Sequence, residues 1–375
     1  MRGPWRRIAV LWAVGLLGAC GAEPELPPTE PAPAAVEQAA FSYFPMGFAR
    51  VSASGGVVTQ FNSTGGAVTV SRSTGSYTVT FAGLGAPVSG ASSGGHVQIS
   101  AEGTGNVRCR SMGWSGSPNL SASVQCNAPD GSLADSAFAI LFFRYTLPAP
   151  STLPATSAYT WVTASGGVSA AYDYNSSGTH NTVTKTATGR YTVRISNATA
   201  VNASMMVTSY SGAAGTVCSV GSWGASLATI ECRDRLGNLA DSAFNFSYSV
   251  TGPTRDQQGA HAWFNGSSAH STYSSALGKV SWCSPASVTG SRSGSLATIV
   301  VSGELGSWDA SPFLRASFVN SYGTAGYCKV ESLTSVEGSP SASTTTVRCY
   351  SATGATLATP VFTFTQVTSD ATGPC

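Results

Sequence analysis

Charged residues are scarce in this sequence. Lys, Arg, Asp and Glu make up 10% of the 375 residues, whereas an ordinary soluble domain has about 25%. The formal net charge is only +2, and no basic stripe is present that would neutralise phosphates. These shortages exclude a nucleic-acid-binding protein and a charge-rich helical protein. Disorder over most of the length is excluded too, because 42% of the residues are hydrophobic and 10% are aromatic.

Motifs for metal or redox chemistry are also lacking. The sequence has no Cys-x-x-Cys pair, and its four histidines are scattered. His261 and His270 together with Asp256 show none of the spacings typical of metal ligands, and His180 stands alone. We therefore expect neither a metal ion nor a cofactor.

One hydrolase-like motif is present. Residues 90–94 match the G-x-S-x-G pattern, in which Ser92 would be the nucleophile. That pattern requires a turn from a strand into a helix, and no helical segment follows it here. An envelope hydrolase that uses Ser92 and His96 is therefore kept as the alternative function.

The first twenty residues have the order of an export signal. Three arginines among residues 2–7 precede an apolar run at residues 8–17, and small residues stand directly before Cys20. The run is shorter than the roughly 18–20 residues that a membrane-spanning helix needs. We expect residues 1–19 to be a cleaved signal peptide.

This stretch resembles the lipobox of bacterial lipoproteins. The resemblance implies export, cleavage before Cys20, a diacylglycerol thioether on the Cys20 sulfur and acylation of its new amino group. Gly21 stands where an Asp would imply retention in the inner membrane, so the resemblance implies the outer membrane, on its periplasmic or its surface face. The lipid would then be the membrane attachment. Residues 20–40, rich in Pro and Glu, are expected to be an extended and disordered linker.

The remainder contains an internal repeat. The hexapeptide 133–138 recurs letter for letter at 239–244 and in altered form at 357–362. Upstream segments recur in the same order, which defines three repeats. We place repeat 1 at 41–150, repeat 2 at 151–253 and repeat 3 at 254–375.

Side-chain alternation within the repeats has a period of two. Residues 77–81, 191–195 and 244–248 alternate apolar with polar, as half-buried strands do, whereas 138–143 is apolar throughout and indicates a strand buried on both faces. Short strands separated by Gly, Ser and Asn turns over about 100 residues suit an antiparallel β-sandwich of immunoglobulin-like size. The sequence therefore predicts an all-β protein of three tandem immunoglobulin-like sandwiches.

The cysteines fit both the repeats and export. Without Cys20, eight cysteines remain, an even number that indicates disulfides in an exported protein. Three pairs occupy matching places in the repeats, and the last two cysteines would pair by elimination. The expected bridges are Cys109–Cys126, Cys218–Cys232, Cys328–Cys349 and Cys283–Cys375.

Asp135 and Asp241 recur just before the last strand expected in repeats 1 and 2. Paired with Asp130 or Asp234, they would be candidates for Ca²⁺, which needs roughly six to eight oxygen ligands. No dense acidic loop surrounds them. A turn, or a cap on local backbone N–H groups, is therefore the preferred interpretation.

Trp114 and Trp223 are the candidate binding residues. Each follows the first cysteine of its pair by five positions, so that uninterrupted alternation would expose both rings, and repeat 3 has Leu333 at this place. Exposed rings would stack on sugars or fill a partner's pocket, with contributions from the aromatic residues at 161, 172 and 174. A bulge at the intervening glycines would instead turn the rings inward, and this packing role is the favoured alternative.

These observations predict a non-catalytic envelope or cell-surface lipoprotein. Its folded part would be a rod of disulfide-stapled modules for adhesion, envelope structure, or binding of a glycan or protein. Duplication favours this function over the hydrolase, because binding faces and spacers are repeated more often than catalytic sites.

Overall fold

Alternating apolar and polar residues build β-strands throughout the part of the chain that the structure describes. This computed structural model describes residues 45–86, 94–145, 154–200, 203–250, 259–270, 287–302, 314–323, 326–336 and 342–368, and all of them belong to the unit Gln38–Cys375. Those residues form strands and no helix, so the all-β prediction is confirmed. Accordingly, no helix within them has the length and apolar character to cross a membrane.

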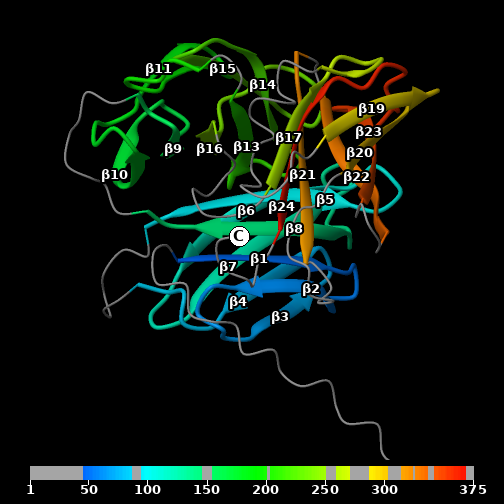
Figure 1. Cartoon of the computed structure of the whole chain (residues 1–375), viewed down its shortest axis with the longest axis horizontal. Coiled ribbons are helices and arrows are strands. Elements are labelled where there is room, and N and C mark those ends of the chain that lie inside the picture. The colour runs from blue at the N-terminus through cyan, green and yellow to red at the C-terminus, as the bar shows by residue number, and fades with distance from the viewer. Residues whose placement is uncertain are drawn as a thin grey trace, which may run out of the picture. The chain divides into compact units, whose positions relative to one another are not determined.

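The strands follow the sequence repeats (Figure 1). Repeat 1 supplies β1 (Met46–Val51), β2 (Val57–Asn62), β3 (Val68–Ser73), β4 (Ser76–Phe81), β5 (His96–Glu102), β6 (Arg108–Ser115), β7 (Leu120–Asn127) and β8 (Ala137–Phe143). Repeat 2 supplies β9 (Ser157–Val162), β10 (Val168–Asn175), β11 (Thr182–Ala187), β12 (Arg190–Arg194), β13 (Ser204–Tyr210), β14 (Val217–Trp223), β15 (Leu227–Arg233) and β16 (Ala243–Ser249). Repeat 3 supplies β17 (Gly259–Phe264), β18 (Ala269–His270), β19 (Ser287–Ser293), β20 (Leu296–Ser302), β21 (Arg315–Ser321), β22 (Gly326–Val336), β23 (Ala342–Ser351) and β24 (Phe362–Thr368).

The strand expected to be buried on both faces is β8. Its residues 138, 140 and 142 lie in the core of repeat 1, together with side chains from β4 and β7. Residues 139, 141 and 143 lie in a second cluster, which also takes in side chains of repeats 2 and 3. The continuous apolar run therefore packs one face of β8 into the core of repeat 1 and the other face into a core shared between repeats.

Two of the sheets cross the repeat boundaries. One eight-stranded sheet has the order β19-β20-β23-β22-β5-β8-β1-β2, and the other has the order β10-β9-β16-β13-β6-β7-β4-β3. The orders β11-β12-β15-β14 and β18-β17-β24-β21 form two four-stranded sheets. Within the described strands, neighbours pair antiparallel except at the two places where strands of different repeats meet, β22–β5 and β13–β6.

Three equivalent contacts join the repeats. The strands β5, β13 and β21 correspond to one another, and a residue one or two positions after the end of each donates its backbone N–H to a neighbouring repeat. The bonds run from Gly103 N to Val330 O at 2.8 Å, from Ser211 N to Ser111 O at 2.8 Å, and from Gly323 N to Val220 O at 3.0 Å. All three donors have positive φ, at 84°, 50° and 61°. Repeat 1 thus contacts repeat 3, repeat 2 contacts repeat 1, and repeat 3 contacts repeat 2.

This cycle of contacts corrects the expectation of a rod. Modules in a row would keep the first and third repeats apart, whereas β5 of repeat 1 is bonded to β22 of repeat 3. The reason is that the backbone N–H after one strand of each repeat is satisfied by a carbonyl of the preceding repeat, with repeat 3 serving repeat 1.

Three cysteine pairs lie at disulfide distance, and they are the three that the repeat predicts. They join β6 to β7, β14 to β15 and β22 to β23 across directly opposed positions, each with a Cα–Cα distance of 4.0 Å. The second cysteine of each pair is 0% exposed, as the alternation predicts. Cys283 and Cys375 lie outside the described residues, as do Cys20, the signal peptide and the 20–40 linker.

Candidate functional site

The three repeats meet where β5, β13 and β21 face one another. Along these strands Ile99, Val207 and Val319 point into the cores of their own repeats. Because successive side chains on a strand point to opposite faces, the residue that follows each of them points toward a neighbouring repeat. These three residues are Ser100, Thr208 and Asn320.

Each of the three polar residues bonds to the backbone of the neighbouring repeat. Thr208 Oγ1 accepts from Ile99 N at 3.0 Å. Asn320 accepts from Val207 N at 3.2 Å and donates to Val207 O at 2.6 Å. Ser100 Oγ accepts from Val319 N at 3.4 Å. The side-chain bonds therefore repeat the cycle of backbone bonds and join the repeats through polar groups that are buried or half-buried.

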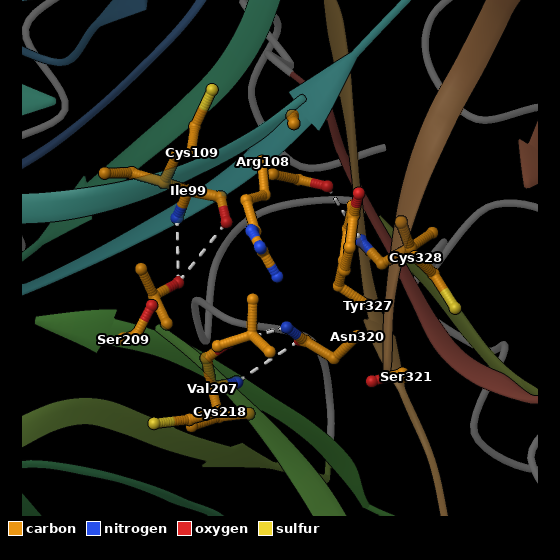
Figure 2. A pocket seen from close by; sticks show the side chains of 15 residues that line it. Ile99, Arg108, Cys109, Val207, Ser209, Cys218, Asn320, Ser321, Tyr327 and Cys328 are labelled. Carbon is orange, nitrogen blue, oxygen red and sulfur yellow. Dashed lines mark hydrogen bonds between the residues drawn. The ribbon is translucent and has the colours of Figure 1, made fainter. Parts of the chain in front are cut away.

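A cavity of about 50 Å³ lies between these strands, and we call it the junction cavity (Figure 2). Every repeat lines it with equivalent residues. The lining consists of residues 99–101, 207–209 and 319–321 and the pairs 108–109, 217–218 and 327–328. The volume suits a few water molecules or one small ion.

Arg108 is the charged residue in that lining, where the other repeats have Val217 and Tyr327. It is 4% exposed. Its Nη2 donates to Pro129 O at 3.2 Å, and its guanidinium carbon lies 5.1 Å from the centroid of the Tyr327 ring. Nε and Nη1 are buried and have no hydrogen-bond partner among the described residues. Burial lowers the pKa of Arg108 from its ordinary value.

Sequence reasoning missed Arg108 and the three polar junction residues. Arg108 had a usable signal, because the repeats differ in charge directly before their first cysteine. The residues Ser100, Thr208 and Asn320 had none, since Ser, Thr and Asn on a strand are ordinary surface residues.

Trp114 is buried, which agrees with the favoured packing role and not with an exposed binding ring. The register of β6 against β7 shifts between Ser111 and Gly113, where Gly113 has a φ of 141°. This bulge turns Trp114 inward to 7% exposure, and its Nε1 donates to Gly94 O at 2.7 Å. Trp223 follows a similar shift at Gly221 and is half-buried against the core of repeat 2.

Both tryptophans belong to aromatic clusters at junctions between repeats. Trp114 and Trp161 both contact Tyr210, with centroid distances of 5.9 and 5.4 Å, and both also contact Tyr172. Equivalent residues form the second cluster, in which Tyr322 lies 4.5 Å from Trp223 and 5.7 Å from Trp263. Tyr174, the remaining aromatic considered from the sequence, is instead buried against Tyr159.

The third junction, between repeats 3 and 1, has different chemistry. Arg50 and Glu102 occupy the places of the Trp and Tyr residues, and their side chains form an ion pair at 2.9 Å. Leu333 stands in place of the third aromatic ring. Lys329, fully buried nearby, donates to Val107 O at 3.4 Å.

His96 is buried and does not reach solvent, as a general base would have to. It is 0% exposed, and its ring centroid lies 5.4 Å from that of Tyr159 and 5.2 Å from that of Phe143. Burial lowers its pKa to about 3. Ser92, the nucleophile of the hydrolase alternative, lies outside the described residues.

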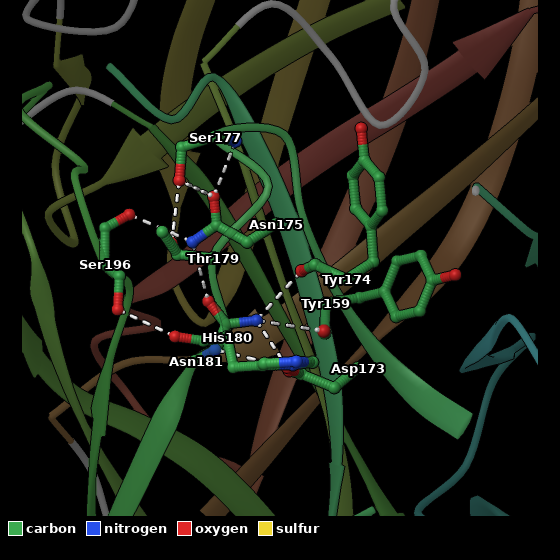
Figure 3. A network of polar contacts seen from close by, with 9 residues as sticks. All are labelled: Tyr159, Asp173, Tyr174, Asn175, Ser177, Thr179, His180, Asn181 and Ser196. Atoms are coloured by element: carbon green, nitrogen blue, oxygen red, sulfur yellow. Dashed lines mark hydrogen bonds and ion pairs between the residues drawn. The ribbon is translucent and has the colours of Figure 1, made fainter. Parts of the chain in front are cut away.

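A second histidine is better placed for chemistry (Figure 3). His180 Nδ1 lies 2.9 Å from the buried carboxylate of Asp173, and the imidazole is 60% exposed. Asn181 donates to the same carboxylate through its backbone N, at 3.2 Å, and its Nδ2, at 2.7 Å. An acid–histidine pair of this kind needs a nucleophile or a metal ion before it can do chemistry, and no hydroxyl or thiol of the described residues bonds to His180 Nε2. The pair therefore orders the loop around residue 180.

The aspartates that precede the last strands have structural roles. Asp135 accepts from Gly75 N at 2.8 Å and Asp241 accepts from Gly189 N at 2.8 Å, so their partners lie in distant hairpin turns and not in the local chain. Asp130 and Asp234 cap turns of their own. The part of the chain with described positions holds no cluster of three or more His, Cys, Asp or Glu suited to a metal ion.

The remaining metal candidates do not meet in the described structure. His261 is buried on β17 at 3% exposure. His270 ends β18, and Asp256 lies outside the described residues.

Comparison with family models, with curated proteins and with solved structures finds no match to this chain.

Proposed function

We propose that this chain is a non-catalytic lipoprotein of the bacterial cell envelope that binds a glycan or protein partner. Its folded part would be three immunoglobulin-like β-sandwiches closed into a cycle, displayed on a spacer from a lipid on Cys20. The observation that carries the proposal is the pair of partly exposed aromatic clusters at two equivalent junctions, because such rings are suited to stacking on sugars or filling a partner's pocket.

The sandwich arrangement is supported by the sheets and the cores. Repeat 1 has strands β5-β8-β1-β2 in one sheet and β6-β7-β4-β3 in another. Val51 and Phe138 from the first sheet share a core with Tyr77 and Val124 from the second. Repeats 2 and 3 distribute their equivalent strands in the same way, which is how two packed antiparallel sheets are built.

A binding role is supported by the aromatic clusters. Trp161, Tyr172 and Trp263 are partly exposed, and the two clusters occupy equivalent junctions. Partly exposed aromatic rings are suited to stacking on sugar rings or to filling a pocket. Charged groups are scarce, so binding should depend little on salt.

The binding experiment uses isolated envelope polysaccharide in a pull-down at low and high salt. Trp161→Leu and Trp263→Leu should each weaken retention, and the double variant should lose more than either alone because two sites act together. Leu236→Ala is the matched control, because Leu236 is 60% exposed and belongs to neither aromatic cluster. Equal retention of the double variant and the control, both melting like the parent, would refute binding through the clusters.

The anchor is tested separately. Cys20→Ser should release the protein from the membrane fraction into the soluble envelope fraction, whereas the parent stays with the membrane. Membrane association of Cys20→Ser would remove the lipid from the proposal.

The hydrolase alternative predicts a different result. Turnover of the same polysaccharide that disappears in Ser92→Ala would replace binding by catalysis. The burial of His96 weighs against this outcome, since a general base must reach the proton that it removes.

A further inference from the structure

The junction cavity contains a buried positive charge with no matching negative charge in its wall. Arg108 is 4% exposed and lines the cavity, and none of the lining residues is acidic. In Figure 2 its guanidinium group lies among lining residues of all three repeats. We propose that the junction cavity binds a small monovalent anion such as chloride through Arg108.

Arg108 does not become neutral by releasing a proton. A guanidinium stays protonated in proteins, and a buried charge without a partner is strongly unfavourable. Asp234 is the carboxylate that attracts Arg108 through space. Its oxygens are already occupied by the backbone N–H groups of Leu236 and Asn238, each at 2.9 Å, and by the Asn238 amide at 3.3 Å.

A second buried cation increases the need for an anion. Arg110 is also 4% exposed, and its burial, followed by the nearby charge of Arg108, lowers the pKa of Arg110 from its ordinary value. Its guanidinium donates to Ala213 O and to Gln125 Oε1, which are both neutral acceptors. The described surroundings of Arg108 and Arg110 therefore carry net positive charge.

The size and polarity of the junction cavity select the anion. About 50 Å³ is available, whereas one water molecule needs roughly 10–15 Å³ of space measured in this way, and a chloride ion is only slightly larger than water. Arg108 offers Nε and Nη1 as donors without partners among the described residues. Ser100 Oγ accepts from Val319 N, which leaves its own hydrogen free to donate. Polyatomic organic anions such as gluconate are too large for this space.

The first experiment compares thermal unfolding of the full-length protein in sodium chloride and in sodium gluconate at equal ionic strength. Chloride at ten times its Kd should raise Tm by roughly 2 °C over gluconate. The difference should vanish in Arg108→Met. Arg72→Met should keep the full difference, because Arg72 lies at the surface in an ion pair with Asp135.

The second experiment does not depend on a variant that folds. Crystals of the parent protein grown in sodium bromide should show an anomalous peak within hydrogen-bonding distance of Arg108 Nε or Nη1. Density without an anomalous signal would mean that water alone fills the junction cavity and would overturn the proposal. Equal Tm values of the parent in chloride and gluconate would overturn it as well.

Discussion

His96 should make the protein acid-sensitive. Its Nε2 lies 2.6 Å from Gln98 Nε2, and Gln98 Oε1 accepts from Thr208 Oγ1 at 2.6 Å. The Thr208 bond fixes the amide so that its N–H donates to His96, which requires an unprotonated Nε2. Protonation would place two donors face to face inside the contact between repeats 1 and 2 and would put a charge among aromatic rings.

The size of the effect follows from the pKa. Burial lowers the pKa of His96 from 6.5 in the unfolded chain to about 3 in the folded protein. Between these values the unfolded state binds the proton and the folded state does not, so that stability falls as pH falls below 6.5. The full effect is about 1.4 kcal/mol per pH unit, but near pH 6.5 the unfolded imidazole is only half protonated, so the loss between pH 6.5 and pH 4.5 is about 2 kcal/mol.

The assay is urea unfolding of the parent and of His96→Phe at several pH values between 7 and 4. Phe retains a ring between Tyr159 and Phe143 but has no proton to bind. The free energy of unfolding of the parent should fall by about 2 kcal/mol more than that of the variant between pH 6.5 and 4.5. Carboxylates titrate in both proteins, so their contribution cancels in the difference. Parallel pH profiles for the two proteins would refute the reasoning.

Two further predictions concern buried side chains. Trp114→Ala should lower the free energy of unfolding by about 3–5 kcal/mol in denaturant titrations, because it empties a packed site; a loss below about 1 kcal/mol would contradict the burial. Lys329, whose pKa burial lowers from 10.5 to about 8, binds its proton less tightly when folded, so that stability rises with pH. The parent should gain about 2 kcal/mol between pH 7 and pH 9.5, Lys329→Met should not, and equal profiles would show that Lys329 is not buried as a cation.

Local features of the fold were predictable from the sequence because they depend on nearby residues. The alternation at 77–81 and 191–195 indicated the strands that the structure shows as β4 and β12. The matching positions of the cysteines indicated the pairs across β6–β7, β14–β15 and β22–β23. Alternation also assigned the second cysteine of each pair to the core, which only requires a period of two.

The relations between repeats were not predictable in this way. Backbone N–H groups make the primary junction bonds, and every residue except proline has one. Trp114 shows a different limit, because one extra residue at Gly113 reverses the face on which it lies. The sequence offered the glycine as a reason for a bulge but contained nothing that required it.

The ion pair between Arg50 and Glu102 has a consequence for how copies of this protein behave toward one another. Head-to-tail contacts between separate molecules continue into filaments unless they close. Here the edge that repeat 1 presents is charged, and it faces Lys329 on repeat 3, which attracts Glu102. If the Trp and Tyr edge of a second molecule docked on repeat 3 instead, Lys329 would be buried without the Glu102 carboxylate. This cost favours docking of the chain's own repeat 1. One polypeptide thus always assembles three repeats, and this assembly does not depend on protein concentration.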